Sequence, residues 1–189
     1  ANKEALVKLI DDVSAKKEAL NNEITRLRSE NERLRTSQER QLTRAKSEIA
    51  NEIRILLRND LRRQDSFEDP RTIQFGFDTN TITVDGHTYF SASSRVILKS
   101  SFFLGLFAAA TKDSSFRHPR FVMIDTIEDK GMEPERSHNF QNQILRVSGE
   151  AKSEHQVIYA TAMISPDLDD EEFLVGRFYT RDEPTLAIG

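Results

Sequence analysis

The sequence predicts an α/β lobe with a parallel sheet, preceded by one long coiled-coil helix. Three observations favour this fold class. Apolar residues follow a heptad pattern near the N-terminus, and residues 1–65 contain no Pro or Gly. Two short apolar runs, FVMID and VIYATA, are typical of buried parallel strands. Segments with the length and composition of helices alternate with these runs, as in strand–helix–strand units. We therefore expect a coiled-coil arm over residues 1–65 and an α/β lobe over residues 66–189.

The composition excludes several classes of protein. The chain of 189 residues has a formal net charge of −4, so charge alone does not indicate nucleic-acid binding. It contains no Cys, which excludes a disulfide scaffold and a thiolate metal site. The longest apolar stretch, residues 102–110, is far shorter than the roughly 20 residues that span a bilayer. The N-terminus is charged and lacks a signal-peptide pattern. We therefore expect a cytoplasmic protein with no membrane partner.

The arm has the apolar seam of a coiled coil. Apolar side chains recur at alternating steps of four and three residues, with Lys17 and Asn31 as polar members. The seam consists of Leu6, Ile10, Val13, Leu20, Ile24, Leu27 and Leu34. It fails at Gln38 and Gln41 and resumes with a shifted phase, which predicts a local irregularity of the supercoil. A helix of this kind is about 80 Å long, more than the lobe can cover. Its partner is expected to be a second copy or an antiparallel segment.

The lobe begins with predicted strands. After the polar segment 64–70, strands are expected near residues 72–77 and 81–84. Asp85-Gly86 predicts a hairpin turn before a further extended segment at residues 88–90.

Helices and strands alternate in the rest of the lobe. Residues 93–111 are too long and too apolar for a strand and predict a largely buried helix. The runs at 121–125 and 155–162 predict buried parallel strands. The segment between them has Pro134 in the first turn of a predicted helix. A strand or hairpin is expected near residues 173–179.

Four small residues stand immediately before the long apolar helix. They are Ser91, Ala92, Ser93 and Ser94, and three of them carry hydroxyls. One hydroxyl is enough for an N-cap. Two interpretations are open: a cap with surplus hydroxyls, or a helix N-terminus whose N–H groups and hydroxyls face an anion.

Acidic residues follow the first predicted parallel strand. Asp125 ends the apolar run, and Glu128 and Asp129 come within the next turn. Ligands bind at the carboxyl ends of parallel strands, and an unpaired carboxylate buried there would be costly unless it binds something. These acids are therefore candidates for a functional site, with an acidic surface loop as the alternative.

The order of these pieces resembles the C-terminal lobe of ABC-class ATPases of the SMC and RecF type. The resemblance covers essentially the whole chain. In that family a long antiparallel coiled coil divides the ATPase head in sequence. The returning arm leads into a signature motif, then Walker B, then a switch strand. Residues 90–95 stand at the signature, residues 121–125 match Walker B, and residues 157–162 stand at the switch strand. The resemblance implies half of an ABC-type ATPase head.

The same resemblance implies a contact with ATP across a dimer. Ser91 matches the signature Ser, while Ala92, Ser93 and Ser94 replace its two Gly residues and its Gln. In the family this element touches the γ-phosphate of ATP bound to the opposite head. The implied partners are therefore a second head, in a head-to-head homodimer, and DNA engaged by the complete assembly.

The resemblance also implies ATP and Mg²⁺ as the bound species. Asp125 takes the place of the Walker B Asp that holds Mg²⁺ through water. Thr126 occupies the usual place of the catalytic Glu, so Glu128 is the candidate that orients the attacking water. Ala162 occupies the place of the switch His, and Thr161 is the candidate for its polar role.

One motif of the family does not occur in the sequence. There is no G-x-x-x-x-G-K-[ST], so the chain has no phosphate-cradling P-loop. The resemblance implies that an N-terminal P-loop half supplies it. The chain also begins without Met inside a helical pattern, and we expect it to be part of a longer protein.

Two other functions stay open. Asp125, Glu128 and Asp129 are the oxygen ligands that a Mg²⁺-dependent phosphotransferase or a Toprim-like nuclease uses, but the serine cluster and the long arm are then unexplained. A non-enzymatic oligomerising adaptor would use the coiled coil as its functional part. A zinc site has no support, because there is neither Cys nor an HxxxH spacing.

Overall fold

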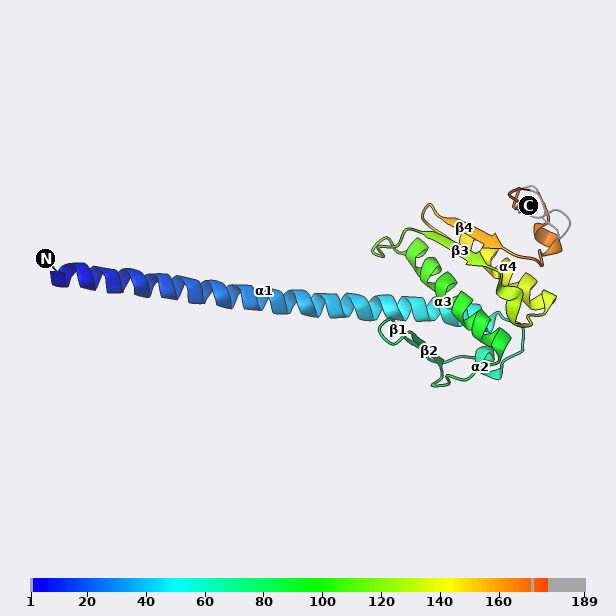
Figure 1. The fold of residues 1–189 in the computed structure, drawn as a ribbon, viewed down its shortest axis with the longest axis horizontal. Coiled ribbons are helices and arrows are strands. Elements are labelled where there is room, and N and C mark those ends of the chain that lie inside the picture. Colours follow the sequence, from blue (N-terminus) through cyan, green and yellow to red (C-terminus); the bar gives the residue numbers. More distant parts are fainter. Residues whose placement is uncertain (1, 171, 177–189) are drawn as a thin grey trace, which may run out of the picture. The chain divides into compact units, whose positions relative to one another are not determined.

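A computed structural model describes residues 2–170 and 172–176 of the chain. The chain divides into two compact units, residues 1–46 and residues 47–189. Helix α1 (Asn2–Arg58), drawn from blue to cyan in Figure 1, forms the first unit and contributes its last turns to the second. The described residues form helices and short strands after one long N-terminal helix. The predicted fold class is confirmed at this coarse level.

The first unit is a single helix whose apolar seam is exposed. The helix is continuous through residues 6–34, as predicted, and also through Gln38 and Gln41, where the seam changes phase. The absence of Pro and Gly and the abundance of Leu, Ala, Glu, Lys and Arg explain this continuity. Along the seam, Leu6 is 58% exposed and Leu27 is 50% exposed. The pairing of this seam in a coiled coil stays a prediction.

The core of the second unit forms where the last turns of α1 meet helix α3 (Ala92–Lys112). The side chains that α1 contributes are all buried, and they are Ile49, Ile53, Leu56 and Leu57. The two helices approach closely at Gly105, where an added Cβ would lie only 2.7 Å from Cγ1 of Ile53. A glycine is therefore required at this crossing.

Helix α3 is the central helix of this core. It begins and ends within a residue of the prediction, and its burial confirms that it is a core helix. Its length and composition also satisfy the criteria for a membrane-crossing helix, but 67% of that segment is buried inside the protein. A buried core helix meets the same criteria, and we interpret α3 in that way.

Strands β1 (Ile73–Gly76) and β2 (Thr81–Val84) form the antiparallel pair that the sequence predicted. The carboxylate of Asp85 closes the open end of the pair. Its Oδ1 accepts hydrogen bonds from the backbone N–H groups of Arg71 (3.0 Å) and Thr72 (2.7 Å).

The further extended segment expected at residues 88–90 does not form a strand. Val84 and His87 exchange backbone hydrogen bonds of 3.2 and 2.9 Å across a tight turn, which ends the pairing at once. The chain then turns inward, and Phe90 is buried against Phe67 of the short helix α2 (Asp65–Glu68), with ring centroids 5.6 Å apart. The segment therefore leaves the sheet so that Phe90 is buried, although its sequence pattern favoured a strand.

Strands β3 (Phe121–Asp125) and β4 (Gln156–Ala160) are parallel neighbours, joined through helix α4 (Pro134–Gly149). The predicted strand–helix–strand unit is confirmed, including Pro134 at the start of the helix. Figure 1 shows this unit in yellow-green to orange at the C-terminal end of the described chain.

The parallel strands are only half-buried, although the sequence predicted burial on both faces. Side chains alternate between the two faces of the pair. Ile124 faces the core, where α3 contacts β3. On the other face Met123 is 61% exposed, and Phe121 and Ile158 are also exposed. Among the described residues no element covers these side chains, so this face of the pair stays open.

The strand or hairpin expected near residues 173–179 is not found in its described part. The backbone N–H groups of Phe173 and Leu174 both donate to the carbonyl of Asp170 at 3.0 Å, which makes a turn rather than an extended segment. Residues 177–179 lie outside the described residues.

Candidate functional site

The carboxyl ends of β3 and β4 lie side by side. Asp125 is in register with Ala160, and the N–H of Thr126 donates to the carbonyl of Ala160 at 3.0 Å. Thr126 then adopts a left-handed conformation (φ 41°, ψ 72°), which ends the strand and starts the short 3₁₀ helix η1 (Ile127–Lys130). This abrupt change turns Glu128 back toward the protein interior.

Glu128 is a buried carboxylate held by three hydroxyls, with only 8% of its surface exposed. Its Oε1 accepts hydrogen bonds from Ser137 Oγ (3.0 Å), Tyr159 Oη (3.5 Å) and Thr161 Oγ1. We call Ser137, Tyr159 and Thr161 the hydroxyl clamp. The other oxygen, Oε2, is buried and has no hydrogen-bond partner. Glu128 therefore has one saturated oxygen and one unsatisfied oxygen.

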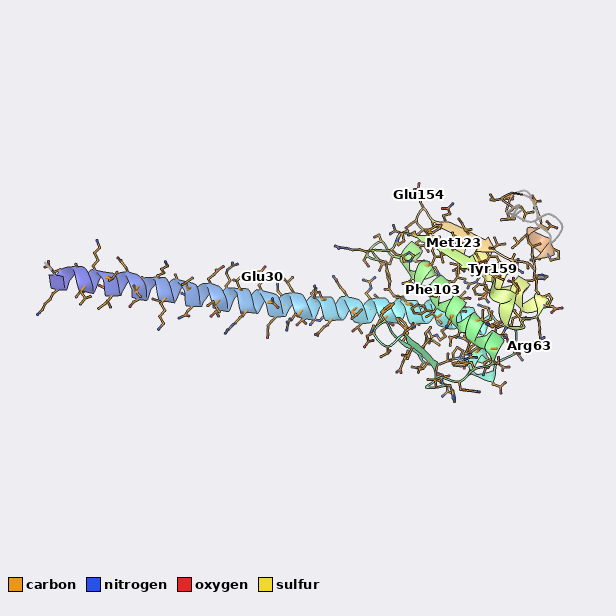
Figure 2. All side chains as sticks on the ribbon, in the orientation of Figure 1. Glu30, Arg63, Phe103, Met123, Glu154 and Tyr159 are labelled. Atoms are coloured by element: carbon orange, nitrogen blue, oxygen red, sulfur yellow. The ribbon has the colours of Figure 1, made fainter. Side chains whose placement is uncertain are left out.

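The clamp residues come from two elements that the fold brings together. Tyr159 and Thr161 are two residues apart at the end of β4, so they point to the same side. Figure 2 labels Tyr159 on β4 and Met123 on the neighbouring strand. Ser137 lies in the first turn of α4. Burial, together with the negative charge of Glu128, raises the pKa of Tyr159 to about 12, so this hydroxyl keeps the proton that it donates.

A glutamine fixes the clamp to the loop that follows β4. Gln141 donates from Nε2 to Ser137 Oγ (3.2 Å) and to the carbonyl of Met163 (2.7 Å). Its Oε1 accepts from the N–H of Ser165 at 2.8 Å. Met163 N–H in turn donates to Thr161 Oγ1 at 2.9 Å. The hydroxyls around Glu128 are therefore held by a continuous polar network.

Asp125 is exposed, unlike Glu128. Its Oδ1 accepts a hydrogen bond from the hydroxyl of Thr126 at 2.7 Å. The desolvation cost expected for a carboxylate at the end of an apolar strand does not apply, because solvent reaches it. Asp125 lies on the exposed face of β3, the face that also carries Phe121 and Met123. It is accessible to a cation or a partner on that face.

A magnesium ion would find few protein ligands at this edge. Within residues 2–170 and 172–176 there is no group of three His, Cys, Asp or Glu side chains arranged to hold a metal. The side chain of Asp129 lies outside the described part of the chain. Mg²⁺ commonly uses only one or two carboxylates together with waters and substrate phosphates. The exposed carboxylate of Asp125 fits that kind of site and does not make a complete metal cage.

The four small residues at the start of α3 have separate roles in the structure. Ser91 is the N-cap of α3, and its Oγ accepts from the N–H of Ser94 at 3.3 Å. Ala92 is exposed. Ser93 and Ser94 both accept hydrogen bonds of 3.2 Å from the guanidinium of Arg136. Ser94 is fully buried, so its hydroxyl does not face an external anion; only the Ser91 end of the cluster is open to solvent.

Arg136 also forms a buried ion pair with Asp60, just beyond the end of α1. Its Nε lies 3.1 Å from both carboxylate oxygens, and its Nη2 lies 2.5 Å from Oδ2. Sequence reasoning missed both residues, since a charged residue is exposed in most proteins. The only available signal was their place near helix ends, which does not reveal a contact across 76 positions.

The first turn of α4 links the two predicted parts of the site. Arg136 binds the hydroxyls of Ser93 and Ser94, and the next residue, Ser137, binds Glu128. The structure also brings Glu128 into direct contact with Thr161, two residues that the sequence singled out separately. Ser91 and Asp125 are exposed at the start of α3 and the end of β3. No family model matches the chain, and no curated protein shows detectable sequence similarity to it.

Proposed function

We propose that this chain is the C-terminal part of an SMC/RecF-type (ABC-class) ATPase head with its returning coiled-coil arm. It acts together with a P-loop half, and we call the two together the complete ATPase. The observation that carries the proposal is Glu128: a buried carboxylate with one unsatisfied oxygen, at the carboxyl edge of a parallel strand pair. This edge is where α/β proteins place ligand-binding groups, and a buried polar atom without a partner calls for a bound group or an ordered water.

The residues of this edge have distinct chemical tasks in the proposal. Glu128 orients the water that attacks the γ-phosphate of ATP. Asp125 holds Mg²⁺, which neutralises charge on the phosphate oxygens when bound. In phosphoryl transfer the protein contributes mainly position and charge. Ser91, at the exposed N-terminus of α3, completes the ATP site of a second head.

The half-buried sheet supports the need for a second half. Parallel sheets are normally covered on both faces, whereas Phe121, Met123 and Ile158 are exposed on one face of this pair. Asp125 ends the strand on the same face. A P-loop half that covered these apolar side chains would also carry bound phosphates toward Asp125.

The arm supports an assembly of long helices. Its seam residues are exposed in the first unit, and in water such a seam is stable when a second helix covers it. In the proposal the outgoing arm of the complete ATPase covers it in antiparallel fashion. The assembly opens and closes a head-to-head homodimer that engages DNA, in repair, chromosome organisation or phage defence.

An adaptor function is the second candidate, because the same exposed seam would serve an oligomer without any enzyme activity.

Calorimetry with ATP and Mg²⁺ distinguishes the ATPase proposal from the adaptor function. The chain alone should show no tight binding, since it lacks a phosphate-cradling loop. The complete ATPase should bind ATP in the micromolar range and hydrolyse it. Micromolar binding by the chain alone would contradict the half-head proposal, and an absence of binding to the full gene product with any P-loop partner would favour the adaptor.

A further inference from the structure

We propose that Thr161, Ser137 and Tyr159 are positioning residues that hold Glu128 by Oε1 and thereby present Oε2 to an ordered water. This inference rests on the proposed function, because it states how the carboxylate that orients the water is itself held in its orientation. It assigns the task to three hydroxyls rather than to a charged or imidazole side chain.

The distribution of hydrogen bonds around Glu128 is strongly one-sided. A carboxylate has two oxygens and about four acceptor sites, yet all three donors of the clamp converge on Oε1. Oε2 is buried without a partner. Buried polar atoms almost always have a partner in the protein or an ordered water. A bound water is the smallest partner that satisfies Oε2, and such a water would be fixed in place rather than exchanging freely with solvent.

Two of the clamp hydroxyls already accept a hydrogen bond from another group. Ser137 Oγ accepts from Gln141 Nε2, and Thr161 Oγ1 accepts from Met163 N–H. Because a neighbouring donor occupies an acceptor site of each oxygen, the hydroxyl acts as a donor, and the carboxylate of Glu128 is the charged acceptor within reach. Such chains of hydrogen bonds reinforce one another. The orientation of Glu128 is therefore imposed by the backbone of the loop after β4 and by α4.

Tyr159 adds a third fixed donor. Its hydroxyl is attached to a ring that is partly buried in the core, so the ring cannot easily move away from Glu128. The raised pKa of Tyr159 keeps this hydroxyl protonated over the range in which proteins work. The clamp therefore stays a set of three donors at any physiological pH.

The test compares variants of the complete ATPase in steady-state hydrolysis. Thr161→Val removes the hydroxyl with little change in shape, and Thr161→Ser keeps the hydroxyl. We expect Thr161→Val to lower kcat about 10- to 100-fold with an unchanged KM for ATP. A wrongly oriented Glu128 carboxylate slows the hydrolysis step but does not weaken the binding of ATP. Thr161→Ser should restore most of the rate. In a Glu128→Gln background Thr161→Val should cause no further loss, since the group that it positions is already disabled.

A second measurement uses the isolated chain and does not depend on ATP. The tyrosinate absorbance of the chain should show one tyrosine titrating near pH 12, absent in Tyr159→Phe. Glu128→Gln should lower that midpoint, because a nearby negative charge is removed. Circular dichroism recorded in parallel identifies the pH values at which the chain is still folded, and only those values enter the titration curve.

The outcomes separate the two proposals. If Glu128→Gln is inactive while Thr161→Val keeps the wild-type kcat, the clamp is overturned and the proposed function stands. If the wild-type complete ATPase does not hydrolyse ATP, the proposed function fails, and the positioning role fails with it. If the tyrosine midpoint does not respond to Glu128→Gln, the charge of Glu128 does not act on Tyr159, and the clamp of three donors is overturned by itself.

Discussion

Arg136 and Asp60 form an ion pair inside the protein, with both side chains only 2% exposed and Nη2 lying 2.5 Å from Oδ2. Asp60 follows the end of α1, and Arg136 lies in the first turn of α4. The same guanidinium also donates to Ser93 and Ser94 at the start of α3. One side chain therefore ties the ends of three helices together next to the candidate site.

Removing one partner of this pair should strongly destabilise the chain. Asp60→Asn leaves a buried guanidinium without its counter-ion, and breaking such pairs typically costs about 3–5 kcal/mol. Urea unfolding of the isolated chain measures this loss. The matched control is Glu133→Gln, which breaks the exposed pair with Arg63 (2.7 Å) and should leave the unfolding midpoint almost unchanged. Similar midpoints for the two variants would show that Asp60 and Arg136 are not buried together.

The stability of the chain should depend on Tyr159 at high pH. The pKa of Tyr159 is raised from 10.0 to about 12, first by burial and also by the charge of Glu128. The folded state therefore keeps the proton longer than the unfolded state does. The contribution of Tyr159 to the free energy of unfolding is complete below about pH 10 and is lost as the pH rises toward 12. Thermal unfolding between pH 9 and 12 should thus show a steeper loss of stability for the wild type than for Tyr159→Phe. Parallel curves would contradict the shift.

Ser91 should have both a structural and a functional role, and the two can be separated. Its hydroxyl caps α3, so Ser91→Ala should lower the stability of the chain by about 1 kcal/mol, and Ser91→Asn should not.

In the complete ATPase, Ser91→Arg should abolish ATP-dependent association of heads while ATP binding to each head remains. Analytical ultracentrifugation with and without ATP measures this. Unchanged association of Ser91→Arg heads would mean that Ser91 is an ordinary cap.

Much of the lobe could be predicted from local patterns. The length and apolar composition of residues 93–111 indicated α3, and the apolar runs around Ile124 and Ile158 indicated β3 and β4. The segment at 88–90 could not be predicted, because burial of Phe90 against Phe67 is a tertiary contact. Burial on both faces of β3 was also expected from composition alone, whereas the described sheet leaves one face open.

The candidate site could be predicted only in part. Glu128 was singled out because it follows the first parallel strand, and Thr161 because the resemblance placed it beside the position of the switch His; the parallel register brings them into contact. The sequence did not pair the other residues: Ser137 of helix α4 contacts Glu128 from nine positions away, and Arg136 pairs with Asp60 across 76 positions. The burial of Glu128 depends on the left-handed conformation of Thr126. The sequence does not predict that conformation, because Thr rarely adopts it.

The measurement that tests the central claim most directly is the rate of ATP hydrolysis by the complete ATPase carrying Glu128→Gln. The amide keeps the shape of the side chain and removes its charge. Loss of a water-orienting carboxylate should slow hydrolysis by about 10²–10⁴-fold, while ATP binding persists and ATP-bound head dimers accumulate. Glu154→Gln, the same change at an exposed position of the lobe, should hydrolyse ATP at the wild-type rate. A wild-type rate for Glu128→Gln would contradict the account.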